Sequence, residues 1–263
     1  MASPATSFPH HLLLILSLMS FMPMTLADSI KAATVCADPS PAGWKATSKV
    51  IGNPLGFSAD IVQAAFDHMA KPVRFISDIP WKRCLHEVEL GHIDFAMGAY
   101  LNDERIKIFT YSVHYNTLTP QIFFLRSKPL TVVHVSDLQR YRGCGLYGSS
   151  YQHYGLKSEQ LDLGSGYDSL ARKLQAGRCD YFVEELEIIN SFDRAGKSIL
   201  SDPEILHSDV SEAMAPSRYL VTAKNGSAAA MLKEINEALE VIVKSGQAAQ
   251  IWKNQEGEIT YKP

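Results

Sequence analysis

The chain of 263 residues carries 25 Lys and Arg against 28 Asp and Glu, which gives a formal net charge of −3. Proteins that bind nucleic acid usually present a basic surface, so this balance argues against a nucleic-acid partner. The length suffices for one large domain or for two lobes of about 100 to 120 residues each.

The N-terminal segment predicts export. The first 27 residues contain no Asp, Glu, Lys or Arg, and the nearly continuous apolar run from Leu12 ends in Thr25-Leu26-Ala27. This pattern is typical of a secretory signal peptide, residues 1–27, cut after Ala27. The run of about 15 residues is shorter than the roughly 20 that a membrane-spanning helix needs. We therefore expect the mature protein in the periplasm.

Beyond the predicted cleavage point, short apolar runs alternate with helical patterns. A helix is predicted over 58–70 with Ser58 as its N-cap, and Pro80 opens a second helix that ends at Gly91. Three residues of the second helix are expected to face inward: Leu85, Val88 and Leu90. The strands predicted around these helices are 33–37, 73–76 and 93–97. Such a βαβαβ order predicts an α/β fold with mainly parallel sheets flanked by helices.

A similar unit recurs further along the chain. Leu174 to Val183 parallels Val88 to Met97, since each reads as an apolar helix end, a glycine, two residues, an aspartate and a strand. Glycine at a helix end is common, so convergence also explains the match. Two such units nevertheless suit two lobes of similar build.

Two β-rich runs, 119–126 and 219–223, are expected to cross between the lobes. Lobe 1 would then comprise residues 28–126 and 219–263, and lobe 2 residues 127–218. The last part reads mostly as one helix, with Gly246 past its end and an apolar face made of Leu232, Ile235, Leu239, Ile242 and Val243.

The four cysteines form an even set in a chain predicted to reach an oxidising compartment. They permit up to two disulfides in three pairings, and the sequence does not choose among them. Because Cys144 and Cys179 precede apolar runs of the same lobe, we favour that pair. An equally open alternative is that the cysteines, which include Cys36 and Cys84, are free buried thiols.

Taken in order, these features resemble the bacterial extracellular solute-binding proteins of family 3, which deliver polar amino acids to ABC transporters. The resemblance covers nearly the whole mature chain. Its marks are Gly56-Phe57-Ser58-Ala59-Asp60-Ile61-Val62, Gly91-x-x-Asp94, Asn102-Asp103-Glu104-Arg105, Tyr111-Ser112 with Tyr115, Gly148-Ser149-Ser150, Gly177-x-x-Asp180, Ser245-Gly246 and Ile251-Trp252. It implies a type II periplasmic-binding-protein fold, in which two lobes joined by a two-stranded hinge close over one ligand.

The same resemblance assigns roles to charged residues. Arg105 matches the arginine that holds the ligand carboxylate, and only a guanidinium offers a planar fork for two parallel hydrogen bonds. Glu185 stands where the family usually places the aspartate that binds the α-ammonium group, with Glu184 beside it. Because strand residues alternate faces, we expect one of the two glutamates to face the cleft, and we favour Glu185.

Other positions are expected to shape the pocket. Trp81 matches an aromatic ring that stacks on the ligand, and Trp44 is a candidate second wall. Gly98 and Tyr100 replace the family's usual hydroxyl pair. Ser149 and Ser150, before a predicted helix, match a further contact to the carboxylate.

The sequence thus predicts a monomeric binder of an amino acid or small carboxylate, with an inner-membrane ABC permease as partner. A sensor that signals to a membrane receptor fits equally well. A lyase or hydrolase that uses Glu184 and Glu185 is the enzymatic alternative. No metal-ligand spacing and no phosphate-binding loop occurs, so no metal or cofactor is expected.

Overall fold

The computed structural model describes residues 1–2, 31–37, 56–76, 79–194 and 199–263. Met1–Ile30 and Lys31–Pro263 form separate units, and the description below concerns the second unit. Apart from its first two residues, the predicted signal peptide lies outside the described residues, and so does Trp44. None of the helices in the described part is long and apolar enough to cross a membrane.

The first sheet has six strands in the order β2-β1-β3-β11-β4, with β5 paired to β11. Here β1 runs parallel to β2 and β3, whereas β11 runs antiparallel to β3, β4 and β5. The strands are β1 (Ala33–Cys36), β2 (Val73–Ile76), β3 (Phe95–Ala99), β4 (Phe109–Tyr111), β5 (Asn116–Thr117) and β11 (Ser217–Ala223).

The second sheet has five strands in the order β10-β6-β9-β7-β8. Its β7 runs parallel to β8 and β9, whereas β6 runs antiparallel to β9 and β10. The strands are β6 (Pro120–Leu125), β7 (Gly143–Leu146), β8 (Leu161–Gly164), β9 (Tyr181–Glu185) and β10 (Ile205–Asp209).

The sheets confirm the α/β class and refine two predictions. Parallel pairing holds for β1 to β3 and for β7 to β9, but β6 and β11 introduce antiparallel pairs, so each sheet is mixed. Moreover, β6 belongs to the second sheet, so the chain changes sheets between Thr117 and Pro120 rather than at residue 126.

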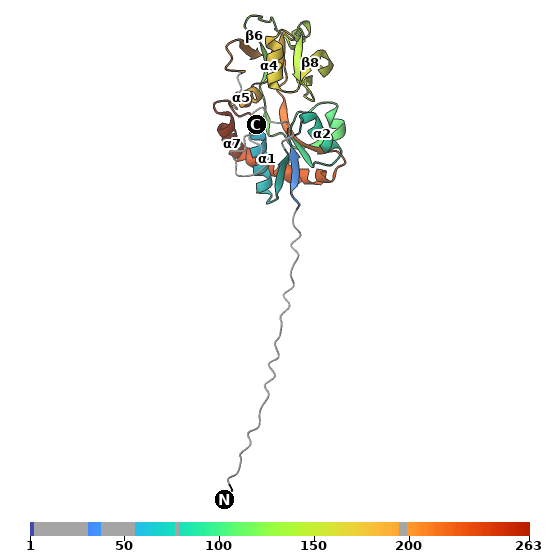
Figure 1. Cartoon of the computed structure of the whole chain (residues 1–263), viewed down its shortest axis with the longest axis vertical. Helices are drawn as coiled ribbons and strands as arrows, with labels where there is room; N and C mark the ends of the chain where they lie inside the picture. Colours follow the sequence, from blue (N-terminus) through green and yellow to red (C-terminus); the bar gives the residue numbers. More distant parts are fainter. Residues whose placement is uncertain (3–30, 38–55, 77–78, 195–198) are drawn as a thin grey trace. The chain divides into compact units, whose positions relative to one another are not determined.

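Helices cover both sheets (Figure 1). Those associated with the first sheet are α1 (Phe57–His68), α2 (Trp81–Glu89), α3 (Arg105–Ile108), α6 (Leu232–Lys244) and α7 (Gln247–Glu256), with the 3-10 helix η4 (Ser227–Met231) before α6. The second sheet is accompanied by α4 (Tyr167–Gln175), α5 (Leu186–Arg194) and the 3-10 helices η1 (Val135–Arg140), η2 (Gln152–Tyr154) and η3 (Ser158–Gln160).

Local sequence explains where several helices begin and end. Pro80 is the N-cap of α2, as predicted, because a missing N–H costs nothing at this position. Gly91 and Gly177 follow α2 and α4 at φ values of +73° and +67°, a backbone conformation in which a side chain is strained. Gly246, at φ +81°, ends α6 and begins the separate helix α7, so the C-terminal segment is two helices and not one.

Two detailed predictions about the helices are wrong. The N-cap of α1 is Gly56, and Ser58 lies within the helix, where its hydroxyl contacts other side chains. Leu90 is 52% exposed, because the buried face of α2 follows the helical period through Trp81, Cys84 and Val88 and leaves Leu90 outside it.

The repeated glycine-aspartate unit has the same structural role in both sheets. Asp94 Oδ2 accepts hydrogen bonds from the backbone and hydroxyl of Thr34, at 2.8 and 2.7 Å, and so links the chain before β3 to β1. Asp180 links the chain before β9 to the start of β7, accepting from the backbone and guanidinium of Arg142 at 3.0 and 2.8 Å. In each half, the aspartate therefore fixes neighbouring parallel strands.

Two disulfides are present, one beside each sheet. Cys144–Cys179, the favoured pair, is present, and Cys36–Cys84 is the second bond. Cys36 ends β1, and Cys84 lies on the buried face of α2, so the second bond holds α2 against the first sheet.

Candidate ligand-binding site

A cavity of about 170 Å³ is lined by residues from both sheets. Every predicted site residue within the described part of the chain lines it: Trp81, Gly98, Tyr100, Arg105, Ser149, Ser150 and Glu185. Glu184 lines it too, so both adjacent glutamates face the cavity. Successive strand residues normally point to opposite faces, but this rule does not hold for Glu184 and Glu185 because β9 ends at Glu185, where the chain turns into α5.

Arg105 is the first residue of α3 and is buried, with 8% of its surface exposed. Its Nη1 donates to the carbonyl of Tyr100 at 3.2 Å, and its Nη2 donates to the carbonyl of Gly148 at 2.9 Å. The guanidinium carbon lies 5.7 Å from the centre of the Trp81 ring, within the range of a cation–π contact. Burial lowers the pKa of Arg105 from its usual value.

The loop before α3 contacts the loop after β7 at several points. Asn102 Nδ2 donates to Ser150 Oγ at 3.0 Å, and the backbone N–H of Asp103 donates to Gln152 Oε1 at 3.2 Å. Gly148 has a φ of +84°, which a side chain would strain. The expected helix after Ser150 is a 3-10 helix of three residues, so it supplies no extended helix dipole for an anion.

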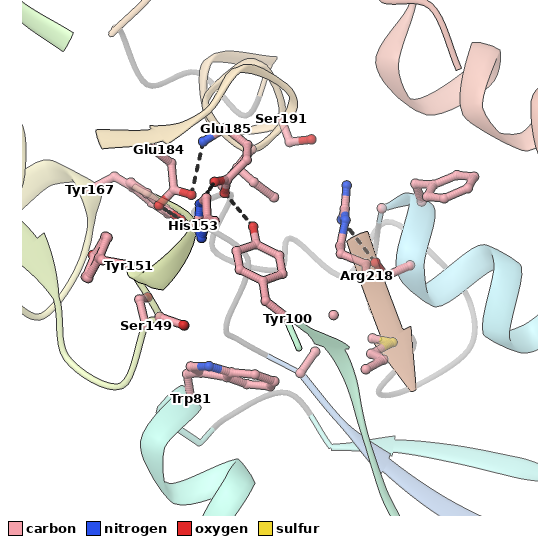
Figure 2. Close-up of a pocket in the computed structure, with 18 of the residues that line it drawn as sticks. Trp81, Tyr100, Ser149, Tyr151, His153, Tyr167, Glu184, Glu185, Ser191 and Arg218 are labelled. Carbon is pink, nitrogen blue, oxygen red and sulfur yellow. Dashed lines mark hydrogen bonds and ion pairs between the residues drawn. The ribbon is translucent and has the colours of Figure 1, made fainter. Parts of the chain in front are cut away.

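Glu185 is 1% exposed and accepts hydrogen bonds from three side chains (Figure 2). Its Oε2 accepts from the Tyr100 hydroxyl at 2.5 Å, and its Oε1 lies 2.7 Å from His153 Nε2 and 3.3 Å from the Tyr154 hydroxyl. Burial alone would raise the pKa of Glu185, but hydrogen bonding and charge from His153 lower it below the usual range. Glu185 is therefore an ionised group that the protein itself already surrounds with donors.

Glu184 has the opposite electrostatic character. It is 6% exposed, and its oxygens accept from the Tyr167 hydroxyl at 2.9 Å and from the backbone N–H of Glu185 at 3.2 Å. Burial, followed by the negative charge of Glu185, raises the pKa of Glu184 well above its usual range. The two adjacent carboxyl groups thus favour different protonation states.

Sequence reasoning missed several residues of the cavity wall, among them Arg218, His153 and Glu256. Arg218 lies in β11, which the sequence indicated only as a crossing strand between lobes. An arginine beside the apolar run 219–223 was the available signal, since buried strands rarely carry an unpaired charge. His153 follows the two predicted serines closely and had no distinguishing pattern.

The residues of the same cavity also indicate what catalysis or metal binding the site could support. No group of three or more His, Cys, Asp or Glu residues is placed to hold a metal ion among the residues that the structure describes. Glu184 and Glu185 are the cavity residues that most resemble a catalytic acid–base pair, because their pKa values are shifted in opposite directions.

Several solved structures have the same fold. The arginine-, lysine-, histidine-binding protein ArtJ from Geobacillus stearothermophilus is 17% identical, with a TM-score of 0.69 over 89% of this chain and 97% of that chain. A histidine kinase sensor domain with similarity to periplasmic binding proteins is 18% identical, with a TM-score of 0.69 over 89% and 98%. A substrate-binding protein of an ABC uptake transporter from Streptococcus pneumoniae, with bound histidine, is 16% identical, with a TM-score of 0.68 over 88% and 95%.

A comparison with curated proteins finds none that matches this sequence. The model of one family, however, matches residues 33–255, which span both sheets and every described wall residue named above. This match confirms the resemblance seen in the sequence. The chain belongs to the bacterial extracellular solute-binding proteins, family 3.

Proposed function

We propose that this cavity binds a small polar solute with a carboxylate, an amino acid or a related acid, by closure of two lobes over it. The observation that carries the proposal is Arg105. Its guanidinium lines the cavity, is buried, and has no carboxylate within 4 Å among the described residues. A buried cation without an anionic partner is costly, and a ligand carboxylate would supply that partner through two parallel hydrogen bonds.

The other wall residues complete the proposed site. Trp81 stacks near Arg105 and offers an apolar face to the ligand, while Ser149 and Ser150 offer hydroxyl groups from the other loop. Glu185 and Tyr100, which are hydrogen-bonded to each other, join the two sides of the cavity. We propose that their contact favours the closed arrangement of the lobes.

Membership of the family supports a role in uptake from the periplasm, with an inner-membrane ABC permease as partner and the protein as a monomer. Several similar structures are of transporter-associated binding proteins, whereas one is a sensor domain. A permease and an ATPase encoded beside this gene would support uptake, and a neighbouring receptor kinase would support sensing. Binding without turnover is the proposed activity, so consumption of a bound solute would contradict it.

Calorimetric titration of the protein with neutral, acidic and basic amino acids and with small carboxylates tests the proposal. Arg105→Ala should weaken any carboxylate ligand by about 2 to 5 kcal/mol, because it removes a buried charge-assisted pair. Arg105→Lys should recover only part of the loss, since an ammonium lacks the planar fork. Arg83→Ala is the matched control, because the Arg83 side chain is 67% exposed. Unchanged affinity in Arg105→Ala would remove Arg105 from the site.

A further inference from the structure

The cavity contains a second buried guanidinium, that of Arg218. Arg218 is 8% exposed and lines the cavity, and its Nη1 donates to Ser58 Oγ at 3.0 Å. Its Nε is buried and donates no hydrogen bond to the described residues. Asn116, which pairs with Arg218 between β5 and β11, does not accept a hydrogen bond from this Nε. No carboxylate of the described residues lies within salt-bridge distance of Arg218. Arg218 is therefore a cation without an anionic partner in the described part of the chain.

The acidic residues of the cavity wall are bound to other groups. Glu185 accepts from Tyr100, His153 and Tyr154, as described above. Glu256 Oε1 accepts from Ser191 at 2.8 Å, and its Oε2 accepts from Asn190 at 3.0 Å. Glu184, the third acidic wall residue, accepts from the Tyr167 hydroxyl and from the backbone N–H of Glu185. Among the described residues, therefore, no wall carboxylate forms an ion pair with either guanidinium.

The two guanidinium groups belong to different parts of the wall. Arg105 is held over Trp81 by carbonyl groups at the start of α3, whereas Arg218 lies beside Ser58 of α1. Figure 2 shows Arg218 and Trp81 well apart, with Tyr100 between Arg218 and the group formed by Glu184, Glu185 and His153. Gly98, at φ +88°, has no side chain to separate Arg218 from the cavity, and the Cβ of a larger residue would lie 3.9 Å from Arg218 Cδ.

We propose that the ligand carries two acidic groups, as small dicarboxylates and acidic amino acids do, with one group bound by Arg105 and the other by Arg218. This inference rests on the proposed function, because it extends the same site. A basic amino acid, the kind that some of the similar proteins bind, would bring a cationic side chain to two arginines that have no anionic partner among the described residues. Such a ligand would leave one guanidinium without an anionic partner, so we expect it to bind more weakly than a diacid.

Pairs of ligands that differ in one charge provide the test. L-glutamate against L-glutamine, and succinate against succinamate, have nearly the same shape, and L-arginine represents the basic class. Calorimetric titration of the wild-type protein should show that at least one diacid binds roughly tenfold or more tightly than its monoamide, because the second charge-assisted contact is lost in the amide. L-arginine should bind more weakly than that diacid.

Arg218→Gln should reduce the ratio of diacid to monoamide affinity to within about threefold, since this ratio reports the charge of the second acidic group. Arg83→Gln, on an exposed side chain, should change neither affinity. If Arg218→Gln does not fold, the ligand pairs measured on the wild-type protein decide the question alone.

The outcomes separate the two proposals. If monoamides or neutral amino acids bind as tightly as the diacids, the inference about two acidic groups is wrong and the proposed function stands. Preferential binding of L-arginine would overturn the inference in the same way. If no carboxylate binds at all, the proposed function itself fails.

Discussion

Replacing Glu184 with glutamine tests whether this buried acid holds its proton at neutral pH. Glutamine has nearly the shape of the protonated carboxyl group and retains a carbonyl that can accept a hydrogen bond. Its amide can also donate to the hydroxyl of Tyr167, which is able to accept. The substitution therefore removes the titration of this group with little change in packing.

The sign of the effect follows from the direction of the pKa shift. The pKa of Glu184 is raised well above 4.5 in the folded protein by burial and by the charge of Glu185. At a pH above the unfolded value, the native state still binds a proton that the unfolded chain has released, so its stability falls as pH rises. The loss is about 1.4 kcal/mol per pH unit, and it continues until the pH passes the folded pKa.

Urea unfolding at pH 5, 6 and 7 measures this effect. The free energy of unfolding of Glu184→Gln, relative to wild type, should increase with pH in this window, by up to about 1.4 kcal/mol per pH unit. For a chain of this size, the melting temperature should move by about 2 to 4 °C per kcal/mol. Glu185 contributes its own pH dependence only at lower pH, because its pKa is lowered and its contribution to stability is lost as pH falls.

Glu237→Gln is the matched control, because Glu237 lies exposed on α6. Its pH profile should run parallel to that of the wild type. If the profile of Glu184→Gln is also parallel to wild type, Glu184 is ionised at neutral pH, and the assignment of opposite protonation states to the two glutamates is wrong.

Two further predictions concern export and oxidation. N-terminal sequencing of the protein recovered from the periplasm should begin at Asp28, the residue after Ala27, and an intact N-terminus in a membrane fraction would contradict the predicted signal peptide. The double substitution Cys144→Ala with Cys179→Ala should lower the free energy of unfolding by roughly 4 kcal/mol, because it frees a loop with a sequence separation of 35 in the unfolded chain. The equivalent Cys36 and Cys84 variant, with a separation of 48, should lose about the same amount, since loop entropy grows slowly with length, and a loss below about 1 kcal/mol in urea unfolding would refute this account.

Much of the site could be predicted from the positions of its residues along the chain. Arg105 follows β3 closely, and Ser149 and Ser150 follow β7, so these residues lie beyond the carboxyl ends of strands. Side chains at such ends meet at one edge of a parallel arrangement, which is where α/β proteins place their ligands. Arg218 escaped this reasoning because it lies in an antiparallel strand that enters the first sheet from the other half of the chain.

The sequence by itself determined the order of strands and helices and where several of them end. Pro80, Gly91 and Gly177 act through their own backbone preferences, which need no distant partner. Apolar spacing likewise set the buried face of α6, because helical periodicity is a property of a few consecutive turns.

Only the tertiary structure decided which distant groups satisfy one another. The Cys36–Cys84 bond depends on α2 packing against β1, and the burial of both Glu184 and Glu185 depends on β9 ending where the cavity begins. The same holds for Arg218, which the sequence shows to be an arginine, whereas only the structure shows that no described residue is its anionic partner. Hydrogen bonds and ion pairs form between residues far apart in the chain. Which cavity groups still lack a partner, and so can bind a ligand, is therefore decided only by the folded structure.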